Sequence, residues 1–361
     1  MSVRVTNQIL LNNDYDLHED IEKNRVNKVP ESKKKKSWKH KVKIILIIIF
    51  ILMVIGSTGL FIFFKTGLFQ EYKELWVQTA MTTMKHQYLA TWFMSDKEIN
   101  DIMKSLEVVN NEDSELNAIE LPKVEEEIEE EKPKENQINV DKISGSTYVG
   151  YVMTISDPSK VKFVDSRKAN MGTKLSEICK KHNAIAGINA GGFTDPNGGG
   201  MGHQLCEPTI IDKKLLYGNR SQKMSLIALT ERGELVLGKY TYQEAMDIGI
   251  QSGLQFGPFI IVNGHNQIQK TNAGGLHPRM AIGQRKDGTM IFVCVDGRQP
   301  GYSIGATQLE LQNIFKKYGA YNAANLDGGS SATMYYDGKV INKTSTPIGE
   351  RYLPNAIIVE K

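Results

Sequence analysis

The sequence NAANLDGGSSATM, residues 322–334, gives the clearest structural signal in the chain. An apolar segment ends at Asp327, and Gly328, Gly329 and Ser330 follow before the chain becomes apolar again. This pattern predicts a buried strand that ends in a carboxylate. The adjacent glycines let backbone N–H groups approach a ligand without interference from a Cβ atom.

The same construction occurs earlier in the chain, in MIFVCVDGR at residues 290–298, where an apolar run ends at Asp296 and is followed by Gly297 and Arg298. Residues 307–318 lie between the two runs and have the apolar spacing of a helix that stops at Gly319. Strand, helix and strand in this order predict a right-handed crossover between two parallel strands. Both aspartates would then lie at the same edge of one sheet, where open sheets collect ligands.

Two carboxylates at one sheet edge favour a catalytic site. Neighbouring strands lie about 4.8 Å apart, so the carboxyl groups of Asp296 and Asp327 would be about 5–10 Å apart, as in glycoside-cleaving pairs. The alternative is two turn residues, because Asp-Gly is also common in hairpin turns.

The composition separates a tail from a globular domain. The net charge of +3 combines a basic N-terminus with an acidic middle, so it indicates neither nucleic acid nor an acidic substrate as a partner. Only 3 of the 32 glycines precede residue 140. We therefore expect a globular domain over residues 142–361, of the α+β class with a mixed β-sheet and crossover helices.

The N-terminal part predicts a single-pass membrane protein. Residues 44–64 carry no charge, which is long enough to cross a bilayer and longer than the core of a typical signal peptide. Lysines crowd the N-terminal side, so residues 1–43 would be a cytoplasmic tail and the domain would be extracellular. Residues 65–141, with their glutamate run, would form a stem and an acidic linker.

The sequence gives little indication of a metal site or a disulfide bond. The three cysteines have no zinc spacing and do not form a disulfide framework. No cofactor is assigned; a divalent cation such as calcium, held by Asp195 and Asn197, stays open beside the interpretation of both as turn residues.

Six motifs occur in a fixed order. They are GINAGGF (187–193), GPFIIVNG (257–264), HPRMAIG (277–283), VCVDGR (293–298), NAANLDGGSSATM (322–334) and ERYLPNAI (350–357). Together they resemble the phosphodiester glycosidase family, over residues 145–361. The resemblance implies hydrolysis of a GlcNAc-type sugar-1-phosphodiester to free sugar and a phosphomonoester, and membrane-anchored bacterial members are often labelled as exopolysaccharide biosynthesis proteins.

The resemblance also implies a set of site residues. Met280 stands where the family usually has Thr and Ser330 where it often has Gly, and both departures concern the identity of the sugar more than the fold. The expected catalytic residues are Asp296, Asp327 and Arg279. The expected substrate-binding residues are Asn189, Gly191, Gly192, His277, Arg298, Asn325, Gly328, Gly329, Ser330 and Arg351.

The arginines suit a phosphate substrate. The chain has 9 arginines among 44 basic residues, yet Arg279, Arg298 and Arg351 all fall inside the motifs. A planar guanidinium donates two parallel hydrogen bonds to phosphate, although structural ion pairs with Asp296 or Glu350 would also explain these residues. His277 is either a proton or hydrogen-bond donor to the substrate or a loop residue bound to backbone.

Two other functions remain open. One is a non-catalytic domain that binds a cell-surface glycan, such as a cell-wall polymer. The other is a phosphodiesterase that cleaves the P–O bond, which the lack of a metal-ligand cluster disfavours. The expected partners are thus a sugar-phosphodiester glycan and the lipid bilayer, and not nucleic acid.

Overall fold

The computed structural model describes residues 31–83, 85–121, 137–195 and 200–361. The chain divides into two compact units, residues 1–66 and 67–361. The described part of the first unit is helix α1 (Glu31–Lys65), in which residues 38–65 are long and apolar enough to cross a membrane. This helix matches the predicted apolar segment, while the basic tail up to residue 30 lies outside the described residues.

The second unit begins with short helices in the predicted stem. They are η1 (Gly67–Phe69), α2 (Gln70–Met81), α3 (Tyr88–Thr91) and α4 (Asp96–Ser105). Helix α4 begins with a capping box, in which the Ser95 hydroxyl accepts from Glu98 N and the Glu98 carboxylate accepts from Ser95 N.

Residues 110–114, within the predicted stem and acidic linker, are hydrogen-bonded to the domain. Asn110 donates to the carbonyl of Phe259 and accepts from its N–H, and Ser114 N donates to the carbonyl of Leu237. The glutamate run at residues 125–131, on which the prediction of an acidic linker was based, lies outside the described residues.

The largest sheet has seven strands in the order β1-β2-β15-β14-β16-β12-β13. Its members are β1 (Ile138–Ser144), β2 (Val149–Ile155), β12 (Phe259–Val262), β13 (His265–Asn266), β14 (Arg279–Arg285), β15 (Met290–Val295) and β16 (Ala320–Leu326). The first strand starts at Ile138, slightly before the expected domain boundary at residue 142.

Helix α7 (Gln308–Lys317) connects β15 to β16, as predicted. Its N-terminus is a capping box formed by Thr307 and Glu310. Strand β14 lies between β15 and β16 and is antiparallel to both, so β15 and β16 run in the same direction. Asp296 and Asp327 therefore follow the same edge of the sheet. The expectation of mixed pairing was wrong for this sheet, in which all neighbouring strands are antiparallel. The two strands that run in the same direction, β15 and β16, do not pair because β14 is inserted between them.

A second sheet repeats this arrangement in the order β18-β17-β4-β19-β3. Helix α5 (Leu175–Lys181) connects β3 to β4, and β19 lies between these two strands, antiparallel to both. The strands are β3 (Val161–Asp165), β4 (Ala184–Asn189), β17 (Met334–Tyr336), β18 (Lys339–Val340) and β19 (Asn355–Glu360).

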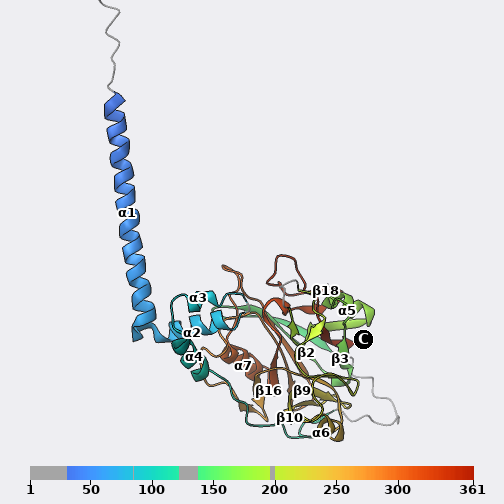
Figure 1. The fold of residues 1–361 in the computed structure, drawn as a ribbon. Coiled ribbons are helices and arrows are strands. Elements are labelled where there is room, and N and C mark those ends of the chain that lie inside the picture. The colour runs from blue at the N-terminus through green and yellow to red at the C-terminus, as the bar shows by residue number, and fades with distance from the viewer. Residues whose placement is uncertain (1–30, 84, 122–136, 196–199) are drawn as a thin grey trace, which may run out of the picture. The chain divides into compact units, whose positions relative to one another are not determined.

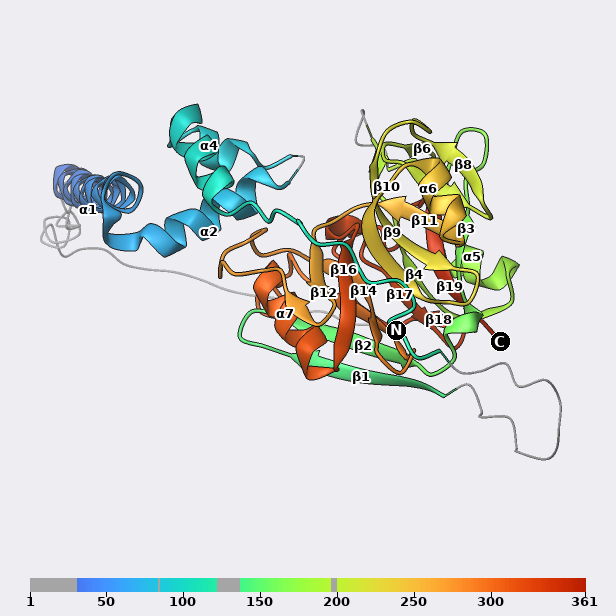
Figure 2. The same cartoon turned by 90° about the horizontal axis from the view of Figure 1, so that it is seen from below.

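A third sheet has the order β10-β9-β11-β7-β8 and is flanked by helix α6 (Tyr242–Asp247), as Figures 1 and 2 show. Its strands are β7 (Thr209–Ile211), β8 (Lys214–Tyr217), β9 (Met224–Thr230), β10 (Leu235–Tyr240) and β11 (Ile250–Gln255). The remaining short elements are η2 (Pro158–Lys160), η3 (Gly329–Ser331), β5 (Phe193–Thr194) and β6 (Gln204–Leu205).

One hydrophobic core joins the three sheets. Phe292 of the first sheet, Ile188 of the second and Ile227 of the third belong to the same buried cluster. A second cluster packs α7 on the seven-stranded sheet through Leu311 and Phe315. Burying a large apolar side chain contributes about 1.5–3 kcal/mol, so these clusters hold the strand ends in fixed positions. The fold class is α+β, as predicted.

Candidate active site

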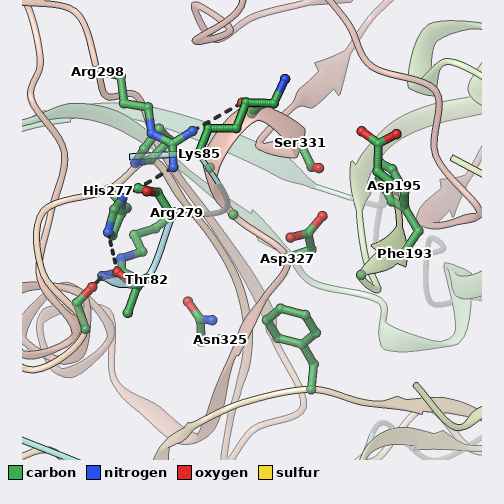
Figure 3. A pocket seen from close by; sticks show the side chains of 18 of the residues that line it. Thr82, Lys85, Phe193, Asp195, His277, Arg279, Arg298, Asn325, Asp327 and Ser331 are labelled. Atoms are coloured by element: carbon green, nitrogen blue, oxygen red, sulfur yellow. Dashed lines mark hydrogen bonds between the residues drawn. The ribbon is translucent and has the colours of Figure 1, made fainter. Parts of the chain in front are cut away.

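A cleft of about 1440 Å³ opens where β16 ends and β14 begins. Most of the residues predicted from the sequence line it: Gly192, His277, Arg279, Arg298, Asn325, Asp327, Gly328, Gly329, Ser330 and Arg351. Among the described residues, Asn189, Gly191 and Asp296 are not part of this lining. In the view of Figure 3, Asp327 lies between Arg298 and His277 on one side and Phe193 and Asp195 on the other.

Asp327 is fixed at the end of β16 by its backbone. Its N–H donates to the carbonyl of Ala190, and its own carbonyl accepts from Asn189 Nδ2 at 2.6 Å. Burial raises the pKa of the Asp327 carboxyl to about 6, against the lowering effects of the Ser331 hydroxyl and of Arg351 and Arg298. A carboxylate of raised pKa in a cleft is typical of a catalytic group.

Arg298 lies at the cleft with a left-handed backbone, at φ 59°. This conformation is uncommon for a residue other than glycine and is found at functional sites. Its Nη1 donates to Ser330 Oγ at 3.2 Å, and its Nη2 lies 3.4 Å from His277 Nδ1. Gly329 allows this approach, because a Cβ there would lie 3.2 Å from Arg298 Nη2. The side chain of Arg298 is exposed and available to an anion.

Arg351 reaches the cleft from the segment before β19. Its Nη2 donates to Asp195 Oδ2 at 2.7 Å, and its guanidinium carbon lies 4.6 Å from the centre of the Phe193 ring. The Asp195 carboxylate also accepts from Gly200 N. Asp195 thus orients an arginine, and Asn197, the other residue considered for a cation, lies outside the described residues.

Arg279 is buried and strongly committed to backbone. Its Nε donates to the carbonyl of Ala306, and its Nη2 donates to those of Gly274 and Gly275, at 2.7–2.8 Å. Burial and the charge of Arg298 lower the pKa of Arg279 to about 10, which leaves it charged at neutral pH. Direct contact of Arg279 with a substrate stays a prediction, and Nη1 is the nitrogen that these bonds leave for it.

His277 is 5% exposed and is neutral at physiological pH. Burial and the charges of Arg279 and Arg298 lower its pKa to about 3. Its Nε2 lies 2.7 Å from Thr82 Oγ1, in the segment after α2. The ring therefore contributes hydrogen bonds to the site and no positive charge.

Asp296 is 1% exposed and bonded within the protein. Its carboxylate accepts from Tyr302 Oη, Asn342 Nδ2 and Lys343 N at 2.9–3.2 Å. Burial raises the pKa of Asp296 while these hydrogen bonds lower it. A direct catalytic role for Asp296 stays a prediction; its contacts support a role in fixing the end of β15 to residues 342 and 343.

Asn189 and Gly191 make hydrogen bonds that fix the backbone around Asp327. The Asn189 side chain donates to the Asp327 carbonyl and accepts from Thr333 N at 3.0 Å. Gly191 N donates to Asn355 Oδ1 at 2.7 Å. These contacts hold β4, β16 and β19 together at the base of the cleft.

Several lining residues were not predicted from the sequence. Ser331 lies inside the recognised motif at residues 322–334, and its position in GGSS was the signal that could have revealed it. Phe193 and Tyr352 also lie inside recognised motifs. Thr82 and Lys85 belong to the stem, where no local pattern indicated a site. Over the described ranges, no cluster of three or more His, Cys, Asp and Glu side chains is arranged to hold a metal ion.

A family model described as phosphodiester glycosidase matches residues 182–360, which contain the whole cleft lining except Lys174 and the stem residues. The C-terminal domain of this chain belongs to the phosphodiester glycosidase family. The membership supports a hydrolase of the glycosidase type, and it confirms the resemblance seen in the sequence motifs.

One protein of Bacillus subtilis is similar to this chain in sequence. The SPbeta prophage-derived uncharacterized protein YomE of Bacillus subtilis (strain 168) is 29% identical over 197 residues, which cover 52% of this chain and 30% of that protein. The chain thus spans less than a third of the length of this relative.

One solved structure shares the fold, and a second gives a lower score. The catalytic domain of zebrafish N-acetylglucosamine-1-phosphodiester alpha-N-acetylglucosaminidase, auto-inhibited by its pro-peptide, superposes with a TM-score of 0.51 at 19% identity. This match covers 62% of this chain and 82% of the zebrafish chain. A putative exported protein from Burkholderia pseudomallei K96243 gives a TM-score of 0.45 at 16% identity, over 59% of this chain and 74% of that one.

Proposed function

We propose that this protein hydrolyses a sugar-1-phosphodiester, releasing free sugar and leaving a phosphomonoester. The proposal is based on the electrostatic environment of Asp327. A carboxyl with a pKa of about 6 lies in a cleft, under the electrostatic influence of Arg351 and Arg298. A negative group for the sugar and positive groups for the phosphate are what such a substrate requires.

The chemistry follows from the charges. The bond between the anomeric carbon and the phosphate oxygen breaks, and the phosphate leaves as an anion that needs little help from an acid. Arg298 and Arg351 bind this anion, and ionised Asp327 stabilises the positive charge that develops at the anomeric carbon. Water supplies the hydroxyl of the released sugar, and its second proton passes to solvent.

The substrate we propose is a GlcNAc-type sugar on a cell-wall polymer or exopolysaccharide outside the cell. The apolar helix α1 supports a membrane anchor, and the lysines before it support a cytoplasmic N-terminus. The family membership supports the phosphodiester linkage. Together these observations favour a surface enzyme that acts on a polymer within reach of the membrane.

The position of bond cleavage tests this proposal against the P–O phosphodiesterase. The full chain in detergent is incubated in ¹⁸O-water with a methyl phosphodiester of GlcNAc-1-phosphate. We expect free GlcNAc that takes its anomeric oxygen from water, and methyl phosphate that contains no ¹⁸O, since water attacks carbon. Either ¹⁸O in the phosphate product or GlcNAc-1-phosphate as a product would refute the glycosidase mechanism. Tight binding of such esters with no product would favour the glycan-binding alternative.

A further inference from the structure

We propose that Thr82, in the stem that precedes the catalytic domain, is a positioning residue of the active site that acts through His277 on Arg298. The stem is here defined as residues 67–108. The effect of Thr82 on hydrolysis rests on the proposed function. The positioning of His277 and Arg298 by Thr82 rests on hydrogen bonds alone.

Helix α2 of the stem is bound to the loop that carries His277. Asn272 Nδ2 donates to the carbonyl of Glu71 at 2.8 Å, and Leu276 N donates to Thr79 Oγ1 at 3.0 Å. The contact between Thr82 and His277 continues the series. Positions 71, 79 and 82 are spaced for one face of a helix, so the loop follows a single face of α2.

The contact between the loop and α2 is close. Gly275 has φ +63°, and a Cβ atom there would lie 2.6 Å from Thr79 N. The carbonyls of Gly274 and Gly275 also accept from Arg279 Nη2. A single loop therefore binds the stem on one side and a buried arginine of the cleft on the other.

The hydrogen bonds allow one proton arrangement on His277. Arg298 can only donate, so His277 Nδ1 must accept from it and the ring proton must be on Nε2. Nε2–H then donates to Thr82 Oγ1, and the Thr82 hydroxyl donates to the carbonyl of Gln78. Every donor in this series has an acceptor, and the direction runs from Arg298 to the stem.

The consequence for catalysis is an oriented guanidinium. Arg298 is exposed, and its described side-chain partners are Ser330 and His277. Without the acceptor at Thr82, only the bond from Arg298 favours the Nε2–H form of the imidazole. That form is then less populated, which weakens one of the two contacts that orient Arg298 towards the phosphate. Misorientation of a charged group lowers transition-state stabilisation more than substrate binding.

Sugar release by the full chain tests the role of Thr82. We expect Thr82→Val, which keeps the shape but removes the acceptor, to lower kcat/KM about 10-fold, mostly through kcat. Thr82→Ser should keep near-normal turnover because its hydroxyl is retained. Thr91→Val in α3, outside the cleft lining, is the matched control and should be unchanged.

Three results would overturn the proposal. They are normal turnover of Thr82→Val, a gain of activity in that variant, and an equal loss in Thr82→Ser accompanied by a lower Tm. The second would mean that the stem obstructs the cleft, and the third that Thr82 has only a structural role.

The protonation of His277 provides a readout that needs no hydrolysis. Ring ¹⁵N shifts are recorded on histidine-labelled full chain in detergent micelles, and His277→Gln identifies the signal among the 7 histidines. We expect the Nε2–H form in the native protein and a shift towards Nδ1–H in Thr82→Val. A native Nδ1–H form would disprove the hydrogen-bond series. A chain that hydrolyses no phosphodiester but has the Nε2–H form would instead refute the proposed function.

Discussion

Asp327 lines the cleft, and burial of its carboxyl group disfavours the ionised form. Substitution by Asn is nearly isosteric and removes the negative charge while leaving a polar group for the Ser331 hydroxyl. We expect Asp327→Asn to lose sugar release by roughly 10²–10³-fold, the range for removing a group that stabilises charge in the transition state. The measurement is product formation by the full chain, with a thermal melt to verify folding. Turnover within a few-fold of the native protein would remove Asp327 from the mechanism.

The raised pKa of Asp327 also predicts how activity depends on pH. The ionised form is the one that stabilises positive charge, and it becomes dominant above the folded-state pKa of about 6. A phosphodiester carries a constant negative charge over this range. Hence kcat/KM should rise as pH increases from 5 to 7 and then level off, in a profile measured between about pH 4.5 and 8. A rate that falls through pH 6 would indicate that the protonated carboxyl is active.

At the scale of elements, Asp296 illustrates a carboxylate that joins one element to another. Its oxygens accept from Tyr302, Asn342 and Lys343 N, so an Asn amide would place a donor against donors. We expect Asp296→Asn to reduce the free energy of unfolding by about 1–3 kcal/mol. Denaturant unfolding of this variant beside Asp327→Asn measures the effect.

The contrast between the two substitutions is the informative result. Ionised Asp327 is destabilised by burial, and its folded-state pKa lies above the unfolded value of about 3.8. Stability is therefore lost as pH rises through 6, and Asp327→Asn should be at least as stable as the native chain at pH 7.5. A stable, inactive Asp296→Asn would instead support the direct catalytic role predicted from the sequence.

Local patterns predicted much of the crossover around α7. The apolar runs, the capping residues and the Gly319 stop each depend on neighbours in the sequence, so β15, α7 and β16 were predicted. The insertion of β14 between β15 and β16 was not. It depends on a choice of strand partner, which the alternation of side chains does not specify.

The stem could not be assigned to the site from its own sequence. The contact between Thr82 and His277 joins residues 195 positions apart and is made by polar groups. The spacing of apolar residues gives no signal for contacts between polar groups. The glutamates farther along the chain indicated an acidic linker instead. Asp296 shows the opposite case, since a motif with the expected chemistry turned out to lie outside the cleft lining of the described residues.

For the whole molecule, the boundary between the compact units falls directly after the apolar helix. The second unit begins at Gly67 and contains the stem, the three sheets and the cleft, so the stem is part of the body that carries the site. The boundary at residue 142 was inferred from the change in glycine content, and it stays a prediction for the start of the glycosidase domain.

The location of the second unit can be tested with a native cysteine. Cys206 is exposed, whereas Cys179 and Cys294 are buried, and all three are free thiols. A membrane-impermeant maleimide added to intact cells should therefore label the chain at Cys206 if the domain is extracellular. Burial and the charges of Glu207 and Asp327 raise the pKa of the Cys206 thiol, so labelling is best carried out near pH 8.5.

The chain offers its own control for this experiment. Cys206→Ser should abolish labelling in both intact and permeabilised cells, because the remaining thiols are in the core. Native chain labelled equally before and after permeabilisation would agree with the lysine-rich flank, which predicts a cytoplasmic N-terminus. Labelling only after permeabilisation would place the cleft inside the cell and exclude cell-wall polymer and exopolysaccharide as substrates. It would leave the phosphodiester chemistry of the site intact, since that depends on Asp327 and the arginines and not on the side of the membrane.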